Sequence, residues 1–100
     1  MAYKVRLSQR VIKFLKKQKD PQLKKKFLKV IYDEIARHPD AGIAKRGTLH
    51  GVFTQGFRYA RVTYRVAYTI DAAGQVVVIF LVGSHENFYD ELKRVLSRSL

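Results

Sequence analysis

The sequence predicts a small α+β domain, in which a twisted, mostly antiparallel sheet of four strands carries an N-terminal helical pair on one face and a short C-terminal helix. Three observations predict this class. Polar and apolar residues alternate in residues 3–8 and 64–70, apolar residues recur at helical spacing in residues 11–35, and residues 76–82 are all apolar. Because 100 residues suffice for one core, we expect residues 1–100 to form a single domain in the order β-α-α-β-β-β-α.

The N-terminal third predicts one strand and two helices. Residues 3–8 alternate between apolar and polar side chains, which is typical of a half-buried strand. Ser8 can N-cap a first helix that runs to about Gln18. Asp20 followed by Pro21 marks the start of a second helix, because Asp is a capping residue and Pro fits the first helical position. This helix is expected to end before the next proline.

The middle of the chain predicts a loop followed by three strands. Residues 40–56 are rich in glycine and are interpreted as a functional loop or a bent edge segment. Strands are predicted at residues 57–62 and 64–70, and residues 72–74 supply a hairpin turn. The apolar run at 76–82 is typical of a central strand that is buried on both faces.

The last helix is predicted from its cap and its charges. Asn87 can cap a helix that directs Phe88 and Leu92 inward, and Asp90 is placed to pair with Arg94. The domain therefore ends in an amphipathic helix.

Arg65 is expected on an uncovered face of the sheet. The helical pair can pack on one face only, and alternation directs toward it the residues best suited to burial, Tyr64, Val66 and Tyr68. Arg65 then points to the open face. A basic face of this kind would suit single-stranded nucleic acid.

Composition indicates a polyanionic partner. The chain holds 20 Lys and Arg against 8 Asp and Glu, a net charge of +12, which exceeds what solubility requires. The absence of cysteine excludes disulfides, thiolate metal sites and a cysteine nucleophile, and agrees with a reducing compartment. No apolar run approaches the roughly 20 residues of a membrane span, and the first residues lack a signal-peptide core. We expect a soluble, cytoplasmic protein.

Several basic and aromatic residues are candidates for chemistry on RNA. RNA cleavage needs a group that removes the proton of the 2′-hydroxyl, a group that protonates the leaving 5′-oxygen, and cations that stabilise the phosphorane, so no metal or other cofactor is required. No metal motif, phosphate-binding loop or nucleophile elbow occurs in the sequence. The candidates are Lys45, Arg46, His50, Arg58, Arg61, Arg65, His85 and Tyr89.

Each candidate also has a structural explanation. A histidine at a strand end is commonly a turn residue, His50 can be merely exposed, and an arginine on a strand can shield a sheet edge. His85 is favoured as functional because it follows the central strand and precedes a helix.

Short motifs in a fixed order resemble one bacterial family. Leu49-His50-Gly51, Phe57-Arg58, Tyr64-Arg65-Val66-Ala67-Tyr68 and the segment 83–89, which follows the apolar run, together resemble the RelE/ParE superfamily of toxins from type II toxin-antitoxin systems. The resemblance covers nearly the whole chain. Each motif is short, whereas their order and spacing in a basic chain of 100 residues are fairly specific.

The resemblance is strongest to the YafQ-type and RelE-type endonucleases, which cut messenger RNA in the ribosomal A site. It implies three partners: messenger RNA, the ribosome and an acidic cognate antitoxin. By this resemblance Arg65 contacts the phosphate, His85 is an acid or base, and Tyr89 orients the target nucleotide. Arg46, Arg58 and Arg61 are expected to bind RNA.

The general base and the activity itself have alternatives. Arg61 occupies a place where YafQ-type members can have a histidine, so Lys45, His50 and His85 all stay candidates for the base. A second interpretation is a ParE-like toxin that inhibits DNA gyrase without cutting RNA. A third is a basic nucleic-acid-binding module without catalysis.

Overall fold

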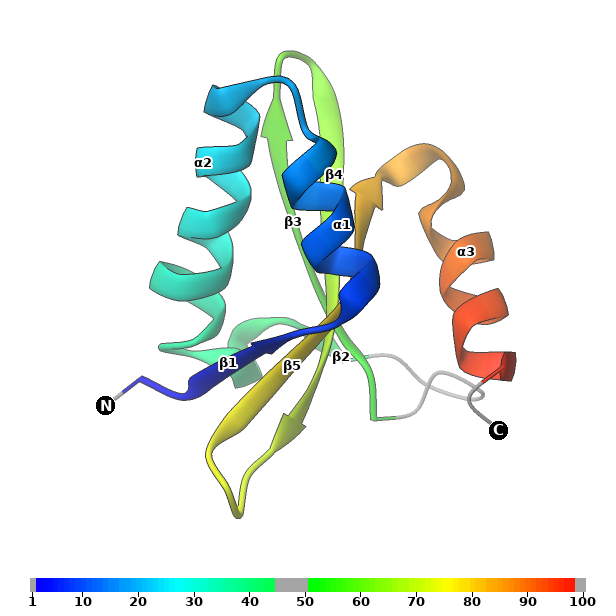
Figure 1. The fold of residues 1–100 in the computed structure, drawn as a ribbon. Helices are drawn as coiled ribbons and strands as arrows, with labels where there is room; N and C mark the ends of the chain where they lie inside the picture. Colours follow the sequence, from blue (N-terminus) through cyan, green and yellow to red (C-terminus); the bar gives the residue numbers. More distant parts are fainter. Residues whose placement is uncertain (1, 45–50, 99–100) are drawn as a thin grey trace.

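The computed structural model describes residues 2–44 and 51–98, which form three α-helices and a sheet (Figure 1). The elements, in chain order, are β1 (Lys4–Leu7), α1 (Gln9–Lys17), α2 (Pro21–Lys29), a π-helical segment (Val30–Ile35), a 3-10 turn (Pro39–Ala41), β2 (Ile43–Ala44), β3 (Phe53–Tyr59), β4 (Val62–Asp71), β5 (Val76–Ser84) and α3 (His85–Arg98). The predicted α+β class is confirmed. Within the described residues, no helix combines the length and the apolar character that crossing a membrane requires.

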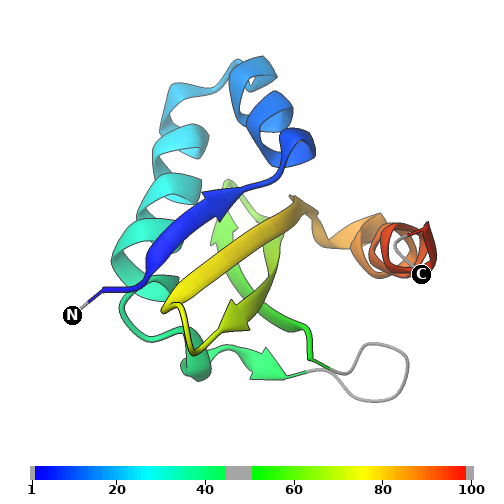
Figure 2. The same cartoon turned by 60° about the horizontal axis from the view of Figure 1, so that its bottom comes forward.

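The sheet is mixed, with the strand order β1-β5-β4-β3-β2. Strand β1 runs parallel to β5, and the other neighbours are antiparallel (Figure 2). The four predicted strands are present, and the two-residue strand β2 extends the sheet beyond β3. Strand β5 lies between β1 and β4 and pairs with both, which agrees with the central position that its continuous apolar sequence predicts.

The predicted caps of the first two helices, Ser8 and Asp20, are confirmed. The Ser8 hydroxyl accepts a hydrogen bond from the Val11 amide at 3.3 Å. The Asp20 carboxylate accepts from the amides of Gln22 at 3.0 Å and Leu23 at 3.2 Å, at the start of α2. These side chains satisfy amides that have no partner inside the helix, which is why the two helices begin where the sequence places them.

One core cluster lies between the sheet and the helical pair. Its fully buried members include Val11, Phe27 and Ile31 from the helices, with Val66 and Tyr68 from β4. Tyr64 packs against the same cluster, so the predicted direction of this alternation is confirmed. The Tyr68 hydroxyl also donates a 2.6 Å hydrogen bond to the carbonyl of Pro39, and burial raises its pKa to about 12.

The opposite face of the sheet is not left open, contrary to the expectation from the sequence. Helix α3 packs on it through Phe88 and Leu92, which form a second cluster with Ala67, Leu81 and Val52. The sheet thus lies between the helical pair and α3 (Figure 2). The cause is the apolar stripe of α3, which needs a surface against which it can be buried. Only part of this face remains for a ligand.

Strand β3 differs from its predicted position. It begins at Phe53, inside the segment that was expected to be irregular, and ends at Tyr59 rather than at residue 62. Phe53 stacks on Tyr68 across the sheet, with ring centroids 5.8 Å apart, which stabilises a strand despite the glycine at position 56. Residues 60–61 form the turn, and both have left-handed backbone angles, with φ of 50° and 67°. Such angles strain a non-glycine residue.

The predicted start of α3 is also wrong. The helix begins at His85, so Asn87 lies in its first turn and is not its cap. Arg94 contacts Glu91 at 3.2 Å, one turn away, instead of the predicted partner Asp90. The helix starts earlier because β5 continues to Ser84 and leads into it directly.

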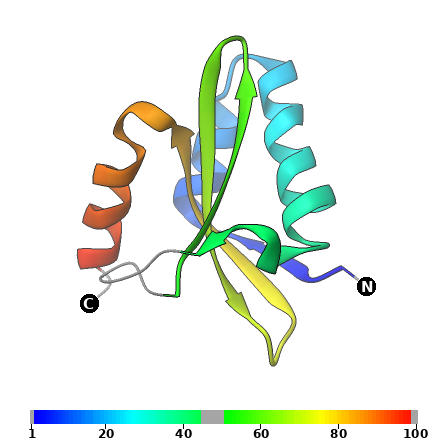
Figure 3. The same ribbon diagram turned by 180° about the vertical axis from the view of Figure 1, so that it is seen from behind.

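A side-chain hydrogen bond ties the β3–β4 hairpin to the start of α2. The Tyr59 hydroxyl donates to the Asp20 carboxylate, at 2.9 Å from one oxygen. Figure 3 shows the tip of this hairpin beside the connection between α1 and α2. The bond lowers the pKa of Asp20, with help from the amides of Leu23 and Gln22, and raises the pKa of Tyr59.

We predict that Tyr59→Phe makes the fold less sensitive to acid. The pKa of folded Asp20 lies below its ordinary value of 3.8, so the contribution to stability is complete above that pH and is lost as the pH falls through the folded value. Melting temperatures between neutral pH and about pH 2 should fall less steeply in Tyr59→Phe than in the wild type. Tyr32→Phe, at an exposed tyrosine, serves as the control. Parallel melting curves for all three proteins would contradict the assignment.

Candidate functional site

Three of the predicted site residues meet where β4, β5 and α3 come together. The Nε of Arg65, in β4, donates a hydrogen bond to Nδ1 of His85 at 3.2 Å. The rings of His85 and Tyr89 lie edge to face, with centroids 5.7 Å apart. The guanidinium carbon of Arg65 lies 5.7 Å from the centre of the Tyr89 ring, within range of a cation–π contact. The structure therefore joins an arginine, an imidazole and a phenol in one cluster.

Local structure explains why the side chains of His85 and Tyr89 lie close together. His85 is the first residue of α3 and follows the central strand directly, so the buried strand fixes its backbone. Tyr89 lies four residues later on the same helical face, where i,i+4 side chains are neighbours. Its ring also packs edge-on against Phe88, with centroids 5.5 Å apart. The phenol is thereby anchored to the core cluster beneath α3.

Arg65 lies between two glycines of the neighbouring strands. It is opposite Gly56 in β3 and opposite Gly83 in β5. A Cβ atom at Gly56 would lie 3.3 Å from Nη1 of Arg65, closer than most such contacts in proteins. The guanidinium thus occupies the space above the backbone of β3. Gly56 was not among the predicted site residues, because the predicted strand began only at residue 57.

In the hydrogen bond between Arg65 and His85, Nδ1 of the imidazole is the acceptor. An imidazole that accepts at Nδ1 carries its proton on Nε2. Arg65 uses Nε for this contact, and its two terminal nitrogens form the fork that suits phosphate oxygens. Together the two side chains can hold a phosphodiester and exchange a proton beside it.

A shallow depression of about 560 Å³ adjoins the cluster. Its lining includes Arg61 from the turn, Thr63 and Tyr64 from β4, Ser84 from the end of β5 and His85 from the start of α3. Arg61, which has a left-handed backbone angle in this turn, lines the same depression as His85.

Arg58 lies on the same face of the sheet as Arg65. It is opposite Thr63, which is two residues from Arg65 in β4, and its side chain is exposed. The predicted RNA-binding arginines 58 and 61 thus lie near the cluster. Lys45, Arg46 and His50 lie outside the described residues, so their part in the site stays a prediction.

Comparison with known proteins gives one family and a consistent fold. A model of the family described as ParE-like toxin of type II bacterial toxin-antitoxin system matches residues 5–93. A double mutant of the Escherichia coli toxin RelE in its free state is similar, with a TM-score of 0.71 and 25% sequence identity over 95% of this chain and 99% of that chain. No curated protein gives a significant sequence match.

Two toxin-antitoxin complexes also contain a chain with a similar fold. For the complex RelBE2 of Mycobacterium tuberculosis, the TM-score is 0.70 and the identity 28%, over 85% of this chain and 93% of that chain. For the intact Escherichia coli complex RelBE, the TM-score is 0.56 and the identity 26%, over 85% of this chain and 99% of that chain.

We predict that alanine at Gly56 and alanine at Gly83 have different effects on Arg65. In Gly56→Ala the new methyl group crowds the guanidinium, whereas at Gly83 no described atom lies within 4 Å of the Cβ position. Gly83→Ala should stabilise the fold by about 0.5 kcal/mol, because alanine loses less backbone entropy in a strand. NMR signals of the Arg65 Nε–H group and the His85 ring should move only in Gly56→Ala. Equal shifts in the two variants would contradict this packing.

Proposed function

The chain belongs to the family of ParE-like toxins of type II bacterial toxin-antitoxin systems, and from this premise we propose that it inhibits translation as an endonuclease that cuts messenger RNA in the ribosomal A site. The observation that carries the proposal is the hydrogen bond between Arg65 and His85 beside the Tyr89 ring. A toxin that acts only by binding does not need a paired cation and imidazole. The similarity to the RelE toxin supports the proposal of endonuclease activity.

The proposed reaction uses the RNA itself as the nucleophile. The 2′-oxygen attacks the adjacent phosphorus, a bond forms between these atoms, and the bond from phosphorus to the 5′-oxygen breaks. A base removes the proton of the 2′-hydroxyl, and an acid protonates the leaving 5′-oxygen. The products are a 2′,3′-cyclic phosphate and a 5′-hydroxyl. This reaction needs a base and an acid but no metal or other cofactor.

Arg65 and His85 have different roles in this step. Arg65 stabilises the charge that develops on the phosphorane oxygens, with two parallel hydrogen bonds that a lysine would reproduce only in part. His85 exchanges a proton with the 2′- or the 5′-oxygen, since an imidazole can act as a general acid or a general base. Lys45 and His50 are the other candidates for the base.

Aromatic and basic neighbours would position the RNA. Tyr89 is the aromatic side chain beside both catalytic groups, and its ring offers a surface against which the target nucleotide can be oriented. Arg58, Arg61 and Arg46 would bind flanking phosphates. The net charge of +12 supports such contacts, which strengthen the attraction to RNA along its whole backbone.

Regulation would come from a cognate antitoxin of acidic character. Chains of similar fold occur in the toxin-antitoxin complexes RelBE and RelBE2. An acidic partner would be captured quickly by a chain with 20 basic and 8 acidic residues. Ribosomes and messenger RNA, the other two partners, place the activity in the cytoplasm.

We predict that the purified chain cuts messenger RNA on translating ribosomes and does not inhibit DNA gyrase. His85→Ala should lower the single-turnover cleavage rate by about 10²- to 10⁴-fold, the usual contribution of a general acid or base. Arg65→Ala should lose activity while it stays folded, and Arg65→Lys should recover part of it.

Arg37→Ala is the matched control, because it removes one exposed arginine beyond the helical pair and should cleave at the wild-type rate. Gyrase inhibition without cleavage would replace the proposal with the ParE-like activity. Full cleavage by folded His85→Ala would remove this residue from the reaction.

A further inference from the structure

A second depression, of about 260 Å³, adjoins the candidate site. Ser84 lines both depressions, and His85 follows it directly. One wall of the second depression is Phe14 of α1, and the other is the first part of α3, with Asn87 and Glu91. This depression therefore lies between α1 and α3, at the end of the central strand.

Its lining combines an aromatic ring with hydrogen-bonding groups. Phe14 and Val82 give apolar surface, whereas the Ser84 hydroxyl and the Asn87 amide give donors and acceptors. Phe14 also packs edge-on against Phe27 in the core, with centroids 5.4 Å apart, so its ring is held in place. Small binding sites typically have this composition, with apolar walls and a few polar groups that orient the ligand.

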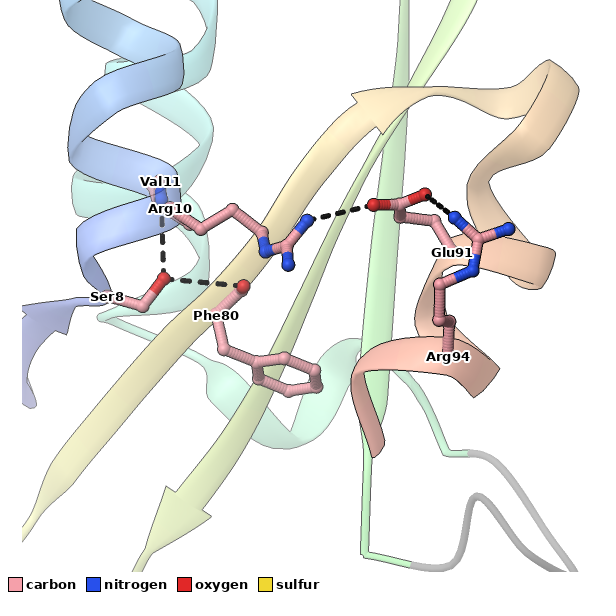
Figure 4. A network of polar contacts seen from close by, with 6 residues as sticks. All are labelled: Ser8, Arg10, Val11, Phe80, Glu91 and Arg94. Carbon is pink, nitrogen blue, oxygen red and sulfur yellow. Dashed lines mark hydrogen bonds and ion pairs between the residues drawn. The ribbon is translucent and has the colours of Figure 1, made fainter. Parts of the chain in front are cut away.

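An ion pair closes one side of this depression. Glu91 contacts Arg10 of α1 at 2.8 Å and Arg94 at 3.2 Å, so it bridges the two helices (Figure 4). The two arginines balance its carboxylate, which would otherwise repel RNA. Their side chains are 45% and 60% exposed, so they also offer positive charge at the rim. The hydroxyl of Ser8 fixes the start of α1 nearby, since it donates to the Phe80 carbonyl at 3.3 Å.

We propose that this depression binds a nucleobase of the substrate RNA. The base belongs to the nucleotide next to the scissile phosphate. A base is planar and aromatic, so it can stack on Phe14 while its edge meets the Asn87 amide. An asparagine amide donates and accepts at once, which allows it to distinguish between base edges. Ser84 lines both depressions, so they adjoin each other, and one strand of RNA can extend from one to the other.

Because this inference rests on the proposed function, its test measures binding and does not need cleavage. Ribosomal complexes carry messenger RNAs in which the scissile nucleotide is 2′-deoxy and one neighbouring nucleotide at a time lacks its base. Removal of the base that enters the depression should weaken binding of the wild-type chain by about tenfold, within the usual range for stacking on an aromatic ring. Removal of the other bases should change binding less.

Variants assign this effect to the depression. In Asn87→Ala and in Phe14→Leu, loss of the same base should weaken binding much less than in the wild type, because the base has lost its partner. Ser97→Ala is the control, since it removes an exposed polar group near the other end of α3 and should behave as the wild type. Melting temperatures verify that Phe14→Leu is folded, and Asn87, which is exposed, carries the test should that variant unfold.

Two results would overturn the inference: equal binding of all abasic RNAs by the wild-type chain, or an unchanged penalty for the same base in folded Asn87→Ala. A chain that does not bind RNA on the ribosome would overturn it as well. Should the wild type bind with this pattern and yet fail to cut an unmodified RNA, the base-binding site stands and only the proposed cleavage is wrong.

Discussion

Strand β5 is in apolar contact on both of its faces, through Val77 and Ile79 with the cluster of α1 and α2, and through Leu81 with the cluster of α3. It also pairs with β1 on one side and β4 on the other. Because β5 is packed on both faces and paired on both edges, it cannot shift its register without moving buried side chains into solvent. The position of its last residue, and hence of His85, follows from this constraint.

The site depends on that constraint because its three members come from elements that β5 joins. Arg65 is in the neighbouring strand, opposite Gly83 of β5, and Tyr89 is one helical turn beyond the end of β5. The apolar contacts of Phe88 with the sheet fix the direction of α3 and therefore that of the Tyr89 ring. Preorganisation of charged and aromatic groups by a buried scaffold is what electrostatic catalysis of phosphodiester cleavage requires.

Local signals in the sequence predicted the caps at Ser8 and Asp20 and the central strand, because each depends on neighbouring residues only. Periodicity shows which residues are apolar but not which surface covers them, so the packing of α3 on the second face was missed. The start of β3 was also missed, since Gly56 interrupts its alternation, and the space above that glycine is explained only by Arg65 in another strand. The sequence predicted Arg65, His85 and Tyr89 as separate candidates. Their contacts with one another could not be predicted, because they depend on how β4 and α3 pack together.

The chemical groups at the ends of the cut RNA show whether the 2′-hydroxyl is the nucleophile in the proposed reaction. If the 2′-hydroxyl is the nucleophile, the upstream fragment carries a 2′,3′-cyclic phosphate, the downstream fragment carries a 5′-hydroxyl, and an RNA with a single 2′-deoxy nucleotide at the scissile position is not cut. We expect all three results for the wild-type chain on ribosomes. A 3′-hydroxyl paired with a 5′-phosphate, or cleavage of the deoxy RNA at that position, would contradict it.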